Sequence, residues 1–232
     1  MTGALRIEGL VKSFVLHTQG GVRLPVLAGL DLEVEPGECV ALHGPSGVGK
    51  STVLRCVHGN YRADAGRILV PHREGTVNMV TAHPREILTV RRETVGHVSQ
   101  FLRVIPRVST ADVVAETLRD RGADREGAAD AARSILRRLN IPTELQQLAP
   151  ATFSGGEQQR VNLARVLVAQ YPVLLLDEPT ASLDRENREV VIELIREAVD
   201  RGAAILGIFH DAAVRDAVAT RVVAMDTGRE EA

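Results

Sequence analysis

Apolar and polar residues alternate along much of the first third of the chain, and this pattern predicts antiparallel strands with one solvated face. Residues 5–10 and 26–34 follow it, and residues 66–70 and 76–80 predict a hairpin with its turn at 72–75. Short, mostly apolar runs predict further strands, and those at 173–176 and 203–209 are typical of strands buried on both faces of a parallel sheet. These further strands cover residues 39–43, 94–99, 173–176, 203–209 and 221–225.

Helical spacing, with apolar residues three or four positions apart, predicts helices over 110–118 and 125–139. Ser109 or Thr110 is expected to cap the first of these helices, and Pro142 to close the second. Further helices are predicted over 84–93, over 157–169 directly after Gly155-Gly156, and over 186–201. Strands that alternate with helices imply an α/β fold with a parallel sheet, a β-rich start and a helical insert.

The amino-acid composition mainly excludes certain classes of protein and partner. Hydrophobic residues make up 44% of the 232 residues and charged residues 25%, as in ordinary globular proteins. The 28 basic and 30 acidic residues give a net charge of −2, and aromatic residues are only 3%, so nucleic acid is not an expected partner.

Cys39 and Cys56 are expected to be reduced core thiols, which favours a cytoplasmic chain. Its start shows no secretory signal pattern. No apolar run approaches the roughly 18–20 residues of a membrane helix, so we expect no direct membrane insertion.

The clearest chemical signal lies at residues 44–52, which satisfy G-x-x-x-x-G-K-[ST] between a predicted strand and a predicted helix. The glycines allow a tight turn with several N–H groups facing one point, and the helix start adds its positive dipole end. Lys50 supplies a mobile charge for the outer phosphates, and the Ser51 hydroxyl is placed to bind Mg²⁺. The pattern predicts a nucleoside triphosphate site formed by Gly44, Pro45, Ser46, Gly47, Val48, Gly49, Lys50, Ser51 and Thr52.

Asp177 and Glu178 place two carboxylates at the end of the predicted strand 173–176. Ligands bind at this edge of open parallel sheets, and Mg²⁺ takes only one or two protein ligands beside water and phosphate oxygens. We therefore assign Asp177 to the metal and Glu178 to orienting or deprotonating a water. Taken alone, the pair could also be an acidic turn after a strand.

The segment Phe153-Ser154-Gly155-Gly156-Glu157-Gln158-Gln159-Arg160 resembles the signature segment of ATP-binding cassette (ABC) ATPases, and the resemblance covers essentially the whole chain. It implies one domain over 1–232, in which 1–100 and 171–232 form the nucleotide-binding core with an antiparallel β subdomain, and 101–170 a helical subdomain. Gln100 matches the glutamine loop of the family, residues 182–184 its D-loop, His210 its switch histidine and Phe14 an aromatic that stacks on adenine. Each of these residues could instead be structural.

The resemblance also implies that two cassettes enclose two ATP molecules. Ser154, Gly155 and Gly156 of one subunit would then cap the γ-phosphate held by the loop of the other. Ser51, Gln100 and Asp177 would bind Mg²⁺, while Glu178, His210 and Gln100 would act in hydrolysis. The second subunit could be an identical chain or a related cassette.

Other segments resemble the L-subunit family of the bacterial carbon–phosphorus lyase (phosphonate utilisation) system. This implies an ATPase that works beside the soluble G, H and I lyase subunits in forming α-D-ribose 1-methylphosphonate 5-triphosphate, with the glycosyl transfer performed by other chains. The segments are 13–17, 22–27, 98–107, 153–160 and 207–211.

Two alternatives remain open at this stage. The first is the cytoplasmic ATPase of a lipoprotein-releasing or macrolide-type exporter, which shares the compact length. The second is a non-transport cassette acting on DNA or ribosomes, but the chain has neither a long coiled-coil insert nor a second cassette.

Overall fold

A parallel five-stranded sheet forms the centre of the molecule. The computed structural model describes residues 5–16, 21–99 and 107–226, and within them the strand order is β6-β7-β8-β3-β9. Every neighbouring pair is parallel, which confirms the predicted α/β class. The strands are β3 (Cys39–His43), β6 (Val95–Val98), β7 (Val173–Asp177), β8 (Ala204–Ile208) and β9 (Arg221–Ala224).

An antiparallel sheet in the order β2-β1-β4-β5 accompanies it. The predicted hairpin is confirmed, because His72 pairs with Gly75 across its turn. β1 and β2 extend beyond the predicted segments, where β-bulges interrupt the simple alternation of apolar and polar residues. The strands are β1 (Leu5–Leu16), β2 (Val22–Val34), β4 (Ala65–His72) and β5 (Gly75–Asn78).

The described helices include three short elements that were not predicted, namely α5, the 3₁₀ helix η2 and α8. Ser109 is the cap of α3, since its hydroxyl accepts a hydrogen bond from Asp112 N. The helices are α1 (Lys50–Val57), α2 (Pro84–Glu93), α3 (Thr110–Arg119), α4 (Arg125–Arg138), α5 (Thr143–Gln146), η2 (Pro150–Thr152), α6 (Gly155–Leu167), α7 (Arg185–Asp200) and α8 (Ala212–Val218).

Two predicted helix boundaries were wrong. α4 is not closed by Pro142, because Asn140 turns the backbone into the left-handed region at φ 53° first. α6 does not begin after the two glycines, because Ser154 caps it and Gly155 is its first residue. Ser154 Oγ accepts from Glu157 N, and the Glu157 carboxylate accepts from Ser154 N at 2.8 Å, so this capping box fixes the helix start.

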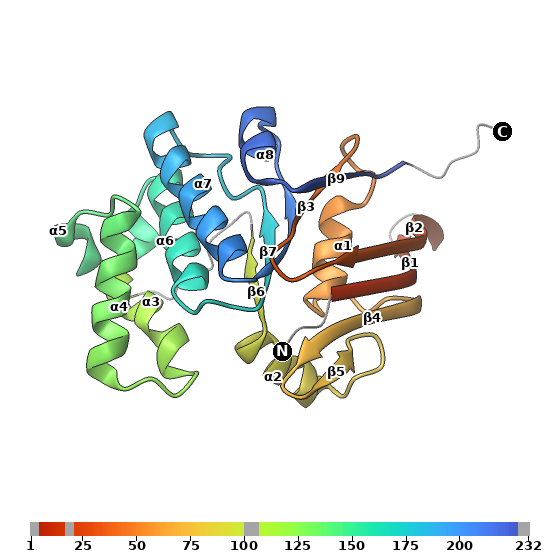
Figure 1. The fold of residues 1–232 in the computed structure, drawn as a ribbon, viewed down its shortest axis with the longest axis horizontal. Helices are drawn as coiled ribbons and strands as arrows, with labels where there is room; N and C mark the ends of the chain where they lie inside the picture. The colour runs from red at the N-terminus through yellow and green to blue at the C-terminus, as the bar shows by residue number, and fades with distance from the viewer. Residues whose placement is uncertain (1–4, 17–20, 100–106, 227–232) are drawn as a thin grey trace.

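The parallel sheet separates two apolar cores. Alternate strand residues, such as Val40 and Leu175, pack with α1, α2 and the antiparallel sheet on one face. Their neighbours, such as Ala41 and Leu174, pack with α3, α4, α6, α7 and α8 on the other. Figure 1 shows this division, with α3, α4 and α5 forming a helical group at one end of the molecule. Both faces of the parallel sheet are therefore covered, which holds the carboxyl ends of its strands in place.

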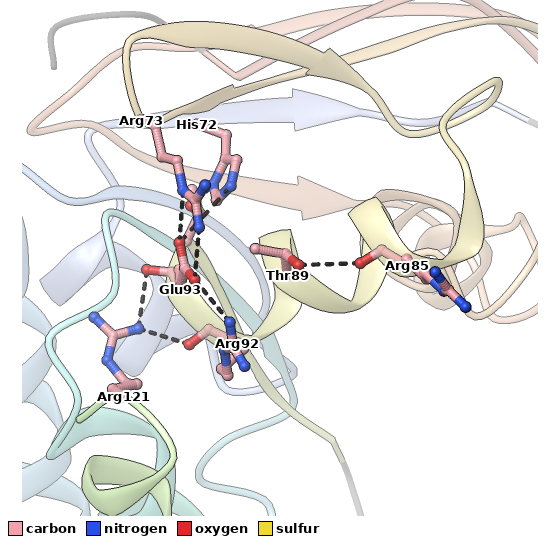
Figure 2. Close-up of polar contacts among 8 residues, drawn as sticks. His72, Arg73, Arg85, Thr89, Arg92, Glu93 and Arg121 are labelled. Atoms are coloured by element: carbon pink, nitrogen blue, oxygen red, sulfur yellow. Dashed lines mark hydrogen bonds and ion pairs between the residues drawn. The ribbon is translucent and has the colours of Figure 1, made fainter.

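Glu93, at the end of α2, joins three parts of the fold (Figure 2). Its carboxylate accepts two hydrogen bonds from Arg73 at the β4–β5 turn, both 3.1 Å, and one from Arg92 at 3.0 Å. These bonds, those from Arg73 first, lower the pKa of Glu93 to about 2. Arg121, just after α3, donates to the carbonyl oxygens of Arg92 and Glu93 at 2.7 and 2.9 Å. The hydrogen bonds from Arg121 thus hold the end of α3, and with it the helical group, against the end of α2.

Among the described residues, no helix combines the length and apolarity that crossing a membrane requires. Cys39 and Cys56 are both free and buried, as predicted. Burial raises the pKa of the Cys39 thiol to about 12 and that of Cys56 to about 11, so both are protonated core residues.

Candidate functional site

The loop between β3 and α1 has the geometry of a phosphate cradle. Gly44, Gly47 and Gly49 all have positive φ, and Gly49, at φ 108°, is the N-cap of α1. A Cβ at Gly44 would lie only 2.5 Å from the Met225 carbonyl oxygen, so no larger residue fits there. The loop can therefore turn its N–H groups and the helix start toward one anion.

Lys50 folds its side chain back over this loop. Its ammonium donates hydrogen bonds to the carbonyl oxygens of Gly44 at 2.7 Å and Pro45 at 2.9 Å. The positive charge therefore lies beside the loop that the motif assigns to the phosphates. A flexible amine held only by two carbonyl oxygens can turn to phosphate oxygens without leaving a buried group unpaired.

Ser51 and Asp177 meet at the carboxyl edge of β7. The Ser51 hydroxyl donates to Asp177 Oδ1 at 3.2 Å, although the two residues are distant in sequence. The pKa of Asp177 is raised, mainly because the carboxyl group is buried. The hydrogen bond from Ser51 opposes this shift, and the nearby charge of Glu178 adds to it. A bound divalent cation would favour the charged form of this carboxylate.

This pair suits Mg²⁺ better than a metal that needs a full protein cage. Both donors are hard oxygens, and within the described residues no group of three or more His, Cys, Asp or Glu side chains could hold a metal ion. Mg²⁺ needs only one or two protein ligands when phosphates and water supply the others. Gln100, the third predicted ligand, lies outside the described residues.

Glu178 and His210, both predicted to act in hydrolysis, lie next to each other. His210 Nε2 lies 3.0 Å from Glu178 Oε1. The histidine side chain is 67% exposed and that of Glu178 21%, so the imidazole is the more accessible of the two groups. The backbone aids this contact, because Glu178 N donates to the carbonyl oxygen of Ile208 at 3.0 Å.

The backbone of Glu178 is in an unusual conformation, with φ 53° in a residue other than glycine. Gln159, buried on α6, supports it from below by donating to the carbonyl oxygen of Pro179 at 3.2 Å and, more weakly, to that of Glu178 at 3.5 Å. Gln159 was not predicted as a site residue. Its place within the signature segment was the available signal, because that segment begins the helix that packs under β7.

The signature residues lie at the exposed start of α6. Ser154 and Gly155 are exposed, and Gly156 packs so closely on the D-loop that a Cβ there would lie 2.8 Å from the Ser182 carbonyl oxygen.

Phe14, the residue predicted to contact adenine, lies on β1 and packs edge-on against Tyr61 with ring centroids 5.2 Å apart. Thus the structure gathers Lys50, Ser51, Asp177, Glu178 and His210, whereas the signature residues form a separate surface beside the D-loop.

A polar cavity of about 960 Å³ lies between α1, β6, α3 and α6 and reaches Asp177. His58 and His97 line it with ring centroids 4.8 Å apart, and neither was predicted to have a special environment. Burial lowers the pKa of His58 to about 3 and that of His97 to about 4, so both imidazoles are neutral near pH 7.

A glycine-rich loop beside a strand-end aspartate–glutamate pair, on a parallel sheet, defines a P-loop nucleoside triphosphatase. The family model described as "ABC transporter" matches residues 27–181. The chain therefore belongs to the ABC transporter family and has the fold of an ATP-binding cassette.

Similar proteins cover nearly all of the chain. LolD 2, a lipoprotein-releasing system ATP-binding protein of Caulobacter vibrioides, is 37% identical over 98% of this chain and 96% of its own length. An uncharacterized ABC transporter ATP-binding protein of Mycobacterium tuberculosis is 36% identical over 90% of this chain, which spans only 61% of that relative. The solved structure of the cassette MJ0796, a dimer in a post-hydrolysis state with ADP and Pi, superposes with a TM-score of 0.87 at 26% identity, covering 98% of this chain and 97% of that one.

Proposed function

We propose that this chain binds Mg²⁺ and ATP at the loop 44–52 and hydrolyses the terminal phosphoanhydride bond with Glu178 as general base. The observation that carries the proposal is the meeting of Glu178 with His210 at 3.0 Å, beside the pair of Ser51 and Asp177. Lys50 and the loop N–H groups hold the phosphates, and Glu178 orients the attacking water and accepts its proton. His210, against Glu178, keeps the carboxylate aimed at that water.

Mg²⁺, bound by Ser51 and Asp177 with Gln100 as a third ligand, would neutralise phosphate charge. The protein's part is to position groups rather than to form covalent bonds. Phe14 would pack on the adenine, since its ring is half-buried near the end of β1, next to Tyr61.

We further propose that the complete site needs two cassettes. Ser154, Gly155 and Gly156 would bind the γ-phosphate of ATP held by the other subunit, which fits their place at the exposed start of α6. The dimer described for MJ0796 with ADP and Pi supports this arrangement. The partner would be a second copy of this chain or a related cassette.

Complementation tests the shared site. Lys50→Met removes the phosphate charge but keeps the signature surface, while Ser154→Arg blocks the signature surface but keeps the loop. If the site is shared, a mixture of the two inactive variants should recover part of the wild-type phosphate release, because mixed dimers contain one intact site. A Lys50→Met and Glu178→Gln mixture serves as a control, since both of these changes disable the loop side. No recovery in the first mixture, with wild-type activity that rises linearly with concentration, would contradict the shared site.

For the task that hydrolysis serves, we propose the ABC subunit of the carbon–phosphorus lyase system, acting in the cytoplasm beside the soluble lyase subunits. The support is the resemblance of several segments to the L-subunit family, including Val22-Arg23-Leu24-Pro25-Val26-Leu27 on β2. Val15, Val22 and Leu24 are exposed apolar residues on the β1–β2 hairpin that carries two of these segments, as expected of a protein-binding edge. ATP hydrolysis would remodel the assembly while other subunits form α-D-ribose 1-methylphosphonate 5-triphosphate.

The second candidate is the ATPase of an ABC exporter of the lipoprotein-releasing or macrolide type. The comparisons favour this candidate, because the relative LolD 2 is named for lipoprotein release and matches over 98% of this chain. In that case a membrane permease, rather than soluble lyase subunits, would dock on the cassette.

Affinity purification of the tagged full chain from its native cells, grown with a phosphonate as phosphorus source, separates the two candidates. Mass spectrometry should identify lyase subunits in the soluble fraction under the first proposal. Recovery of a permease from detergent extracts, with no lyase subunit, would overturn it in favour of the exporter. The Lys50→Met variant purified in parallel shows which of these contacts depend on ATP.

A further inference from the structure

The first turn of α7 holds two consecutive side chains that reach two different functional loops. Arg188 donates to Asp211 Oδ2 at 2.6 Å and to the carbonyl oxygen of Leu183 at 3.1 Å. Its remaining Nε is buried and has no hydrogen-bond partner in the part of the chain that the structure describes. An arginine that leaves a buried N–H unsatisfied while making these two bonds calls for an explanation beyond surface solubility.

Asp211 connects this arginine to the hydrolytic pair. Its other oxygen, Oδ1, accepts from Ala213 N at 2.9 Å and so caps α8, and the residue before it is His210. Because the His210 side chain is 67% exposed, packing does little to hold it. His210 lies 3.0 Å from Glu178, and the Arg188–Asp211 bond ties the residue next to it to the start of α7.

Asn187, the preceding residue, faces the other way, toward the signature helix. Its Oδ1 accepts from Arg160 on α6 at 3.2 Å and from Asn140 after α4 at 3.1 Å. Arg160 also donates to the carbonyl oxygens of Leu139 and Asn140, at 3.0 and 2.6 Å. The start of α7 is thus bonded on one side to the helix that begins with Ser154 and on the other to the loop of His210.

We propose that Arg188 is a positioning residue for ATP hydrolysis, which holds the His210 loop to the D-loop and to the start of α7. This inference rests on the proposed hydrolytic function and adds to it. When the signature end of α6 engages the nucleotide of the partner, the contacts of Asn187 and Arg188 carry the resulting position of α7 to His210. The Arg188–Asp211 pair is about one-third exposed on both sides, so its loss should affect the rate more than the stability.

Steady-state kinetics with purified full-length variants test this role. Arg188→Ala should lower kcat for ATP about tenfold, since small displacements of catalytic groups cost that much or more, and leave the dissociation constant for ATP within about twofold of wild type. Arg188→Lys, which can still reach Asp211, should recover part of the lost rate. The control Arg201→Ala removes an arginine from the far end of α7, where its contact with Glu197 is 3.8 Å, and should leave kcat unchanged.

A double-mutant cycle with Asp211→Asn completes the test, because asparagine keeps an acceptor for the α8 cap. If Arg188 acts through Asp211, the double variant should be no slower than Arg188→Ala alone. An unchanged kcat in Arg188→Ala, a loss confined to ATP binding, or fully additive losses in the cycle would each overturn the inference while the wild type still hydrolyses ATP. A wild type that releases no phosphate would instead overturn the proposed function, and the inference with it.

Discussion

The half-buried histidine pair that lines the cavity, His58 and His97, allows a quantitative prediction about stability. In the folded chain the pKa values of His58 and His97 are lowered to about 3 and 4, from an ordinary value of 6.5, with burial as the main cause and mutual repulsion adding to it for His58. As the pH falls below 6.5, the unfolded chain takes up protons at these positions and the folded chain does not. Stability is therefore fully present above pH 6.5 and is lost as the pH falls toward the folded pKa values.

The magnitude follows from the linkage relation. Between pH 7.0 and pH 5.5, one such histidine lowers the free energy of unfolding by about 1 kcal/mol and the pair by about 2–3 kcal/mol. Because both folded pKa values lie well below pH 5.5, this loss is set by the unfolded value and changes little with the exact folded one.

Urea unfolding of wild type and of the double variant His58→Phe/His97→Phe, at pH 7.0 and 5.5, measures this difference. The variant should lose about 2–3 kcal/mol less than wild type over that interval, whatever its stability at pH 7.0. His83→Asn, which keeps a side-chain acceptor at the start of α2, controls for removal of a surface imidazole. Equal losses in wild type and double variant would refute the reasoning, since they would mean that these imidazoles are protonated in the folded chain.

Three further predictions concern the site. Lys50→Met should weaken ATP binding by about tenfold to a hundredfold, the usual value of hydrogen bonds to a charged group, as measured by titration with a fluorescent ATP analogue. Gln159→Leu leaves the Pro179 carbonyl oxygen without its 3.2 Å donor, so it should cost about 1–3 kcal/mol in urea unfolding and lower kcat more than ATP affinity; unchanged values would show that the strained backbone at this point needs no such support. Gly44→Ala places a Cβ 2.5 Å from the Met225 carbonyl oxygen, so its melting temperature should fall and its ATP affinity drop together, and a variant with wild-type affinity would contradict the cradle geometry.

The parts of the candidate site that could be predicted from the sequence are those formed by residues that follow one another in the chain. The phosphate loop and the pair of Asp177 and Glu178 each follow a short apolar strand, and parallel strands bring their carboxyl ends to one edge. α2 was predicted with its observed bounds, since Pro84 suits the first helical position.

The parts that escaped prediction depend on partners far apart in the chain or on competing local signals. The contacts of Gln159 with Pro179 and of Arg188 with Asp211 join residues about 20 positions apart, and no periodic pattern marks such pairs. At the start of α6, two glycines suggest a loop, but the reciprocal bonds of Ser154 and Glu157 outweigh their poor helix propensity. Likewise, α4 ends before Pro142, because the backbone of Asn140 is in the left-handed region.

The central claim is that Glu178 drives ATP hydrolysis at the loop 44–52, and phosphate release by purified Glu178→Gln protein tests it most directly. The amide keeps the size of the side chain but cannot accept the proton from water. We predict that phosphate release from Mg²⁺ and ATP falls at least about a hundredfold, as for loss of a general base, while ATP binding is retained. Turnover by Glu178→Gln at the wild-type rate would contradict the account.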